Sequence, residues 1–178
     1  DAVVVAGSDG RIARMVICGI VHDSVHLRCM EYLPQTETER TEVILVQALL
    51  KGEKMDFVVQ KAVELGASAF CPITTDHVVV RYDAKKAAAK TARWQKIADE
   101  AAKQCGRSAL MRVAQPASLS ALLQDAALLH APDTAIIFCY EGERTQSMRT
   151  VLRSVDARRI VLIVGAEGGF SPAEAAAI

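Results

Sequence analysis

From Val43 onward, short apolar segments alternate with segments of helical spacing, and this alternation constrains the fold more than any other feature of the chain. Four apolar segments have the length and composition of buried strands: EVILVQAL, SAFCPITT, TAIIFCYE and RIVLIVG. Helices are expected between them, over KGEKMDFVVQKAVELGA, residues 84–105 and TQSMRTVLRSV. Strands that alternate with helices predict an α/β fold, in which a mostly parallel sheet carries helices on both faces.

Apolar residues at helical spacing define a buried stripe on each of the first two helices. The first stripe consists of Met55, Val58, Val59, Ala62 and Val63, and the second of Trp94, Ile97, Ala98, Ala101, Ala102 and Cys105. Gly66 is a natural stop for the first helix. Pro72 lacks a backbone N–H and therefore predicts a sheet edge or a strand end within SAFCPITT.

Residues 1–33 are rich in strand-forming segments. AVVVAG and ARMVICGIV flank a turn at residues 7–10, and SVHLRCMEYL follows. Three strands are too few to close a barrel, so they predict a hairpin or part of a small barrel. The polar, apolar-poor segment 34–42 is expected to be a linker.

Composition permits a large core and sets bounds on partners. The apolar fraction is 51%, and 21 basic residues balance 21 acidic ones. Residues 51–112 hold 12 Lys and Arg against 7 Asp and Glu, a net charge of +5 that the rest of the chain offsets. Such a basic middle is typical of a polyanion footprint, although a solvated, lysine-rich helix face is equally consistent with it.

The chain has no apolar run of membrane-spanning length and no secretory signal, so we expect a cytoplasmic protein. It begins at Asp1 without a methionine, and we expect its natural start to lie upstream. The odd number of cysteines and the lack of a CxxC spacing argue against a disulfide framework and a zinc site. His22 and His26 are four residues apart, but their strand-like context predicts no metal site.

The segment VGAEGGFSPAE predicts a glycine loop between a buried strand and a helix. Ser171 can cap the helix, Pro172 suits its first position and Glu174 completes a capping box. Residues 165–170 are therefore the loop. In an open α/β sheet, a loop after a buried strand usually meets a ligand.

Two familiar phosphate loops are excluded, because no lysine follows these glycines and their spacing is not G-x-G-x-x-G. Glu167 would also repel a phosphate. A ligand that is neutral or cationic at this point is expected, and S-adenosylmethionine, which carries a sulfonium and no phosphate, meets that requirement. The alternative is that Glu167 only ties the loop to neighbouring backbone amides.

Three stretches resemble one known family, the 16S ribosomal RNA uridine-N3 methyltransferases of the trefoil-knotted SPOUT superfamily. VGAEGGFSPAE is similar to the family's G-P-E-G-G-[FL]-S-x-x-E signature. KGEKMDFVVQKAVELGA resembles K-x-x-[KR]-x-[DE]-x-x-[IV]-Q-K-x-x-E-L-G, and RWQKIADEAAKQCGR resembles W-x-x-I-x-x-E-A-x-x-Q-x-x-R. The three stretches follow the family's order and cover roughly residues 43–178.

The chain departs from the family pattern at several points. Ala166 replaces a proline, and Asp76 and His77 stand where the family commonly has Glu-Arg. The family continues with an L-G-x-x-[IV]-L-R-x-E-T-A segment that threads the knot and closes over the cofactor. We therefore expect this chain to be part of a longer protein. The expected domains are a partial PUA-like, RNA-binding barrel over 1–36 and a SPOUT-type methyltransferase domain over 37–178 without its knot segment.

The resemblance implies methyl transfer from S-adenosyl-L-methionine to N3 of a uridine in small-subunit ribosomal RNA, by a homodimer with the knot at its interface. Residues implied to bind the cofactor are Tyr140, Glu141, Gly165, Glu167, Gly168 and Gly169. Residues implied to act in catalysis are Arg107 and Glu167. The candidate RNA contacts in the matched stretches are Lys61, Gln104 and Arg107. Lys86, Lys90 and Arg93 are further candidates, because they recur at i, i+4 and i+7 as one basic stripe on the long helix; phosphate contact and plain solvation are both open for this stripe.

Several of these residues also have a purely structural interpretation. Lys61 and Glu64 share a helix face and are expected to pair with each other rather than to act in catalysis. Arg107 could be an ordinary surface arginine, and Tyr140 with Glu141 an ordinary strand end. For the whole chain, the alternatives are a non-catalytic RNA-binding fragment and a SPOUT methyltransferase that acts on another RNA.

Overall fold

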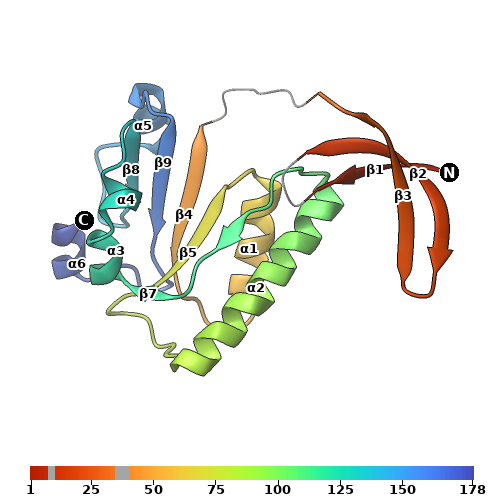
Figure 1. The fold of residues 1–178 in the computed structure, drawn as a ribbon. Helices are drawn as coiled ribbons and strands as arrows, with labels where there is room; N and C mark the ends of the chain where they lie inside the picture. Colours follow the sequence, from red (N-terminus) through yellow and green to blue (C-terminus); the bar gives the residue numbers. More distant parts are fainter. Residues whose placement is uncertain (8–10, 35–40) are drawn as a thin grey trace.

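The computed structural model describes residues 1–7, 11–34 and 41–178, which form two separate sheets (Figure 1). The first sheet is antiparallel, and its strands are β1 (Ala2–Ala6), β2 (Ile12–Val21) and β3 (Ser24–Tyr32). The strands of the second sheet are β4 (Glu42–Ala48), β5 (Ala69–Thr74), β6 (Arg112–Val113), β7 (Ala117–Ser118), β8 (Thr134–Cys139) and β9 (Arg159–Val164). The helices are α1 (Lys54–Glu64), α2 (Ala84–Cys105), α3 (Leu119–Leu123), α4 (Ala126–Leu129), α5 (Met148–Ser154) and α6 (Pro172–Ala177).

The second sheet is parallel throughout, in the order β6-β5-β4-β9-β8, and β7 also pairs with β5. The steps from β4 to β5 and from β5 to β6 run in one direction across the sheet, and the return to β8 runs in the other. Because such crossovers are right-handed, α1 and α2 lie on one face, and α3 and α4 on the other. The predicted α/β architecture is therefore confirmed.

The three N-terminal strands lack a core of their own within the described residues. Ala13 is their one buried residue, and every residue of β3 is exposed. The predicted strands are present, whereas the predicted turn and linker fall largely on residues 8–10 and 35–40, outside the described part of the chain. The same holds for the expected domain boundary at residues 36 and 37.

Helix α1 buries the stripe that its spacing predicts. Met55, Val59, Ala62 and Val63 are buried, and Val58 is half-buried. The helix ends as expected, because Gly66 adopts a left-handed conformation with φ of 98°.

Helix α2 has the predicted bounds. The Asp83 side chain accepts a hydrogen bond from the backbone N–H of Lys86 at one end, and Gly106 is left-handed at the other. Trp94 and three alanines of the stripe are buried, but Cys105 is exposed. The stripe prediction is therefore wrong at Cys105, which lies in the last turn, beyond the neighbouring elements that cover the rest of the stripe.

Pro72 lies at an interruption of the sheet rather than at its outer edge. The carbonyl oxygens of Ser68 and Phe70 accept hydrogen bonds from Arg112 and Ala114 on the side where β6 lies. Pro72 lies two residues after Phe70, so its backbone points to the same side of β5 as that of Phe70. On that side it faces the gap between β6 and β7. Its missing N–H therefore costs the sheet no hydrogen bond.

Asp56 joins α1 to α2. Its carboxylate accepts hydrogen bonds from Trp94 Nε1 at 3.1 Å and from the Arg93 guanidinium at 2.6 Å. Trp94 is the largest fully buried side chain and has Tyr82 beside it, with 6.4 Å between the ring centroids. Burying an indole ring is favourable when its N–H finds an acceptor, and Asp56 supplies that acceptor.

Residues 106–131 contain the elements that the sequence patterns do not predict. Strands β6 and β7 are two residues long, and α3 and α4 span five and four residues. Elements this short have no periodicity that a sequence window can detect.

Replacing Asp56 with alanine should destabilise the protein, because the buried Trp94 N–H would lose its acceptor. We expect Asp56→Ala to lower the free energy of unfolding by about 1–3 kcal/mol in denaturant titrations. Arg93→Ala is the matched control: it removes only an exposed ion pair and should cost less than about 1 kcal/mol. Equal losses in the two variants would contradict this assignment of the buried contact.

Candidate active site

An open cleft of about 820 Å³ lies where β8 and β9 end at the carboxyl edge of the parallel sheet. In sheets of this kind, ligands bind at that edge. Strand β8, the chain after it, α5 and the glycine loop line the cleft: Ile136, Ile137, Phe138, Cys139, Tyr140, Glu141, Glu143, Gln146, Met148, Val151, Val164, Gly165, Ala166, Glu167, Gly168 and Gly169.

The glycine loop, residues 165–170, is a tight turn followed by a capped helix. The backbone N–H of Gly169 donates to the carbonyl oxygen of Ala166 at 3.0 Å, and Gly169 is left-handed with φ of 65°. The predicted capping box is confirmed: Ser171 Oγ accepts from the Glu174 N–H, and the Glu174 carboxylate accepts from the Ser171 N–H. Pro172 opens α6, as expected.

Side chains from the two sides of β9 fix the two ends of the loop. Gln47, which is buried near the end of β4, donates its amide to the carbonyl oxygen of Gly165 at 2.9 Å. Glu141, just after β8, accepts from the backbone N–H of Phe170 at 3.2 Å. A Cβ on Gly169 would overlap the Glu141 carboxylate, so only glycine permits this arrangement.

The segment after β5 holds the loop from another direction. His77 Nδ1 lies 2.7 Å from the carbonyl oxygen of Gly168, and Ser171 Oγ donates to the Asp76 carboxylate at 2.7 Å. Because a carbonyl oxygen only accepts, Nδ1 carries the proton in this contact. The Asp76 N–H in turn donates to Glu174 at 2.8 Å, so the segment clamps both the loop and the start of α6.

Glu167 is tied to the start of α1. Lys54 Nζ lies 2.6 Å from its carboxylate, and this hydrogen bond, with support from backbone N–H groups of Glu167 and Lys51, holds the pKa of Glu167 below its usual value. A carboxylate with a lowered pKa is a poor proton acceptor. These contacts agree with the alternative interpretation, in which Glu167 ties down the loop. The partners of Glu167 are a lysine side chain as well as backbone amides.

The predicted cofactor residues Tyr140, Glu141, Gly165, Glu167, Gly168 and Gly169 all line this one cleft. Tyr140 stacks on Phe138 with 5.5 Å between the ring centroids, and the Phe138 ring meets Phe170 edge-on. Glu143, a further acid of the cleft, accepts hydrogen bonds from the Thr145 hydroxyl and from two backbone N–H groups, which lowers its pKa to about 2.

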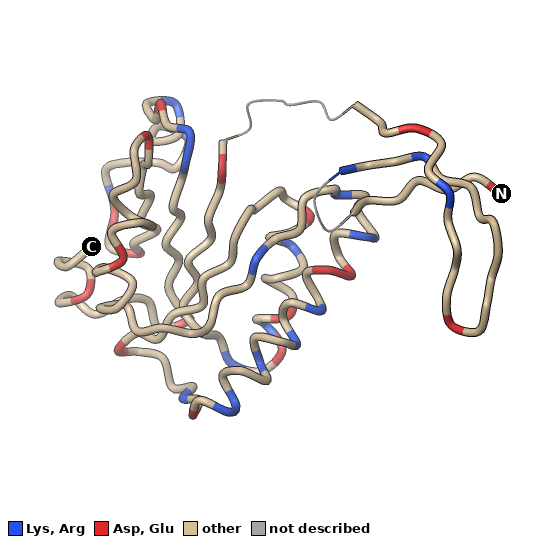
Figure 2. The backbone as a smooth tube through the Cα atoms, in the orientation of Figure 1, with Lys and Arg blue, Asp and Glu red and all other residues tan. Residues whose placement is uncertain are grey.

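Most residues predicted to contact RNA lie on α1 and α2, away from the cleft. Lys61 pairs with Glu64, as its spacing suggests. Lys86 lies over the Tyr82 ring and Arg93 pairs with Asp56, whereas Lys90 is half-exposed. Figure 2 shows the Lys and Arg positions repeated along α2.

Gln104 is exposed near the end of α2 and lines a shallow groove together with Gln60, Arg93, Lys96 and Glu100. The groove therefore combines basic, acidic and amide side chains.

Arg107, expected to contact the target nucleotide, lies elsewhere. Its Nη1 donates to the carbonyl oxygens of Val63 at 2.9 Å and Ala67 at 2.8 Å. These atoms lie at the end of α1 and just before β5, at the amino edge of the sheet, whereas the glycine loop lies at the carboxyl edge. The structure does not bring Arg107 and Glu167 together, because the Arg107 guanidinium ties the end of α2 to the turn after α1.

Comparison with known proteins supports a single family. A family model described as an RNA methyltransferase domain matches residues 37–178. The ribosomal RNA small subunit methyltransferase E of Bacillus subtilis is 32% identical over 179 residues, an alignment that covers 98% of this chain and 68% of that protein. The chain belongs to this methyltransferase family.

Further proteins are similar to this chain at lower sequence identity. The Synechocystis methyltransferase E is 28% identical and is covered over 55% of its length. The chain thus spans 55% to 68% of the length of these relatives. A Legionella pneumophila methyltransferase solved in complex with SAM is 26% identical with a TM-score of 0.84; the alignment covers 99% of this chain and 70% of that one. The Neisseria gonorrhoeae methyltransferase E, at 23% identity and a TM-score of 0.83, shares the fold, and its alignment covers the same shares.

Two observations concern only the described residues. No group of three or more His, Cys, Asp or Glu side chains there could hold a metal ion. Of the helices described, none combines the length and apolar character that crossing a bilayer would require.

Gln47 and Lys54 hold the loop in this family member, yet sequence reasoning did not single them out. Gln47 is a polar residue that follows four consecutive apolar residues of β4 and is 4% exposed, so its position in EVILVQAL is a usable signal. Lys54 matches the [KR] position of the family pattern, but its partner could not be predicted, because Glu167 lies 113 residues away in sequence. His77 was noticed only as a departure from the family pattern.

Gly169 should be more sensitive to substitution than Gly168. Gly169→Ala places a Cβ in a left-handed backbone and against Glu141, so we expect a loss of about 1–2 kcal/mol in the free energy of unfolding. Gly168→Ala would direct its Cβ toward His77, at 3.1 Å from the His77 Cβ, and should cost less. Denaturant titrations of both variants measure the difference; a larger loss in Gly168→Ala would contradict this geometry.

Arg107→Lys should lower stability without changing ligand binding in the cleft. A single ammonium cannot reproduce the contacts of the guanidinium with two carbonyl oxygens, so we expect a loss of about 1–2 kcal/mol. Arg112→Lys, at an exposed position of β6, is the control. Thermal denaturation measures the loss of stability, and calorimetry measures the cofactor affinity. A selective loss of cofactor affinity would contradict the structural role.

Proposed function

We propose that the protein containing this chain transfers a methyl group from S-adenosyl-L-methionine to N3 of a uridine in small-subunit (16S) ribosomal RNA. The observation that carries the proposal is the convergence of the predicted cofactor residues on one cleft, in a chain that belongs to the ribosomal RNA small subunit methyltransferase E family. Relatives of this fold have been solved with the cofactor bound.

The cleft suits this cofactor in size and charge. A volume of about 820 Å³ lies within the range of ligand pockets, roughly 300–1,000 Å³. Three carboxylates line it, from Glu141, Glu143 and Glu167, and no Lys, Arg or His is among its lining residues. Lys54 balances the charge of Glu167, so Glu141 and Glu143 carry the acidity of the cleft. An acidic cleft without a basic side chain favours a ligand that carries a sulfonium and an amino group over a nucleotide phosphate.

The chain's own residues supply binding and positioning. When bound, S-adenosyl-L-methionine supplies an activated methyl group on its sulfonium sulfur. The carboxylates favour that positive charge, and the side chains of Gln47, Lys54 and Glu141 hold the loop in place before the ligand arrives. A prepositioned loop lowers the barrier to methyl transfer by orienting the reactants.

The basic surface of α2 supports RNA as the substrate class. Lys85, Lys90 and Lys96 have no ion-pair partner within the described residues, and Lys86 pairs only with an aromatic ring. Such cations attract a phosphate backbone without sequence preference. We propose RNA contacts for Lys86, Lys90, Arg93 and Gln104. The partial PUA-like barrel, the cytoplasmic location, the homodimer and the trefoil knot of the complete protein are further parts of this proposal.

Methyl transfer by the full-length protein tests the function directly. We expect it to bind S-adenosyl-L-methionine in calorimetry and to transfer labelled methyl to small-subunit but not large-subunit ribosomal RNA. Digestion and mass spectrometry should identify the product as N3-methyluridine. Cofactor binding with methylation of a different RNA would favour the alternative substrate, and the absence of both binding and transfer would refute the proposal.

A further inference from the structure

The glycine loop separates two hollows of opposite charge. Its cleft side is lined by carboxylates, with no basic side chain. On its other side lies a smaller hollow of about 280 Å³. The residues that line it are Leu49, Lys51, His77, Val78, Val79, Ala166, Glu167 and Gly168. Residues 166–168 therefore form a shared wall, with an acidic space on one side and a basic space on the other.

Lys51 is the lysine that lines this hollow and can bind an anion. Its ammonium has no ion-pair partner among the described residues, whereas the nearby Lys54 is committed to Glu167 at 2.6 Å. Glu167 is the one acid that lines the hollow, and Lys54 balances its charge, while the backbone N–H of Lys51 donates a hydrogen bond to it. The hollow thus retains a net positive charge.

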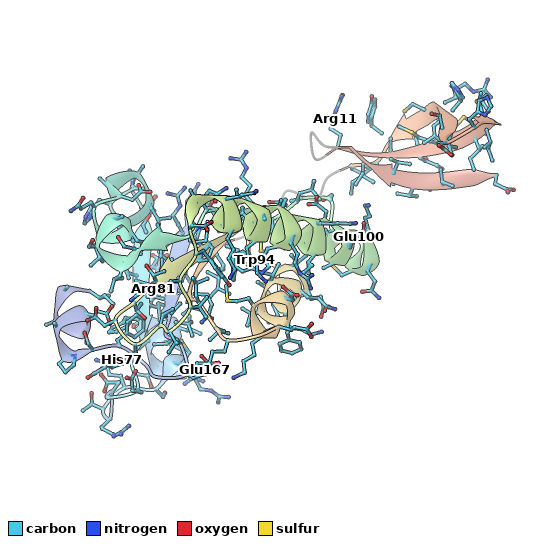
Figure 3. The ribbon with its side chains drawn as sticks, turned by 90° about the horizontal axis from the view of Figure 1, so that it is seen from below. Arg11, His77, Arg81, Trp94, Glu100 and Glu167 are labelled. Atoms are coloured by element: carbon cyan, nitrogen blue, oxygen red, sulfur yellow. The ribbon has the colours of Figure 1, made fainter. Side chains whose placement is uncertain are left out.

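His77 lines the same hollow, but its ring does not supply the contact to an anion. A neutral ring that donates from Nδ1 to the Gly168 carbonyl oxygen, at 2.7 Å, has only an acceptor at Nε2, so Lys51 is the donor available to a phosphate. Figure 3 shows His77 and Glu167 together at one end of the α/β part, far from Glu100 and Arg11. The hollow therefore lies beside the cofactor loop and apart from the far end of α2.

We propose that this hollow binds a backbone phosphate of the RNA substrate next to the target nucleotide, with Lys51 as the principal contact. The inference rests on the proposed function. A base that receives a methyl group at the glycine loop brings its flanking phosphates within one nucleotide's length of that loop. Phosphate contacts from lysine position a nucleic acid without reading its sequence. The loop then keeps a cationic cofactor on its acidic side and a polyanion on its basic side.

The test compares three variants of the full-length protein. Lys51→Gln removes the proposed contact, Lys51→Arg keeps its charge, and Arg153→Gln removes an equal charge from α5, outside both hollows. Fluorescence anisotropy with a small-subunit RNA fragment gives the RNA Kd and its salt dependence. Calorimetry gives the Kd for S-adenosyl-L-methionine, and thermal denaturation shows that each variant is folded.

We expect Lys51→Gln to weaken RNA binding by about tenfold and to reduce the slope of log K against log salt by roughly 0.7. Its KM for RNA in methyl transfer should rise in proportion, and its cofactor Kd should stay at the wild-type value. Lys51→Arg should retain most of the RNA affinity, and Arg153→Gln should match the wild type.

Two results would overturn the subsite. One is an RNA Kd and salt slope in Lys51→Gln that equal those of Arg153→Gln. The other is an equal loss of cofactor affinity, which would assign Lys51 to the cofactor site. Failure of methyl transfer in the wild type refutes the proposed function separately, because the anisotropy measurement reads the phosphate contact whether or not transfer occurs.

Discussion

The parallel register of β4, β9 and β8 is the constraint on which the site depends. Val164, the last residue of β9, pairs with Gln47 of β4 on one side and with Cys139 of β8 on the other. The chain segments that leave the three strands must therefore emerge side by side. This arrangement brings Gln47 and Glu141 to the two ends of a loop from which they are far removed in sequence. A shift of one residue in either pairing would move these side chains to the opposite face of the sheet.

The glycine loop is held by contacts that each involve a different part of the chain. Strand β4, the start of α1, the segment after β5 and the segment after β8 each contribute one side chain or more to it. Individually such hydrogen bonds contribute modestly, about 0.5–1.5 kcal/mol each. Together they fix a loop backbone that has a left-handed glycine and lines the cleft. The positions of the carboxylates that face the cleft, and of the lysines on the other side of the loop, then follow from where these segments meet the loop.

The sequence predicts the elements that have strong local signals. Helix α2 has the expected bounds, residues 84–105, and the capping box at Ser171 is present. The residues of the loop and of the segment after β8 were expected to meet, and they do line one cleft. What could not be predicted depends on tertiary contacts. Lys54 and Glu167 form a pair only because β4 and β9 are adjacent, and Arg107 lies at the amino edge because α2 runs across the sheet before it ends.

The position of Pro72 affects which changes in chain length this domain can accept. The chain between β6 and β7 crosses the position that Pro72 faces, and no ladder hydrogen bond is available there to be broken. Residues added or deleted in the connection from Ala114 to Pro116 would leave the pairing of β5 with β4 intact. We therefore expect this connection to tolerate changes of length over evolution while the geometry beneath the glycine loop is preserved.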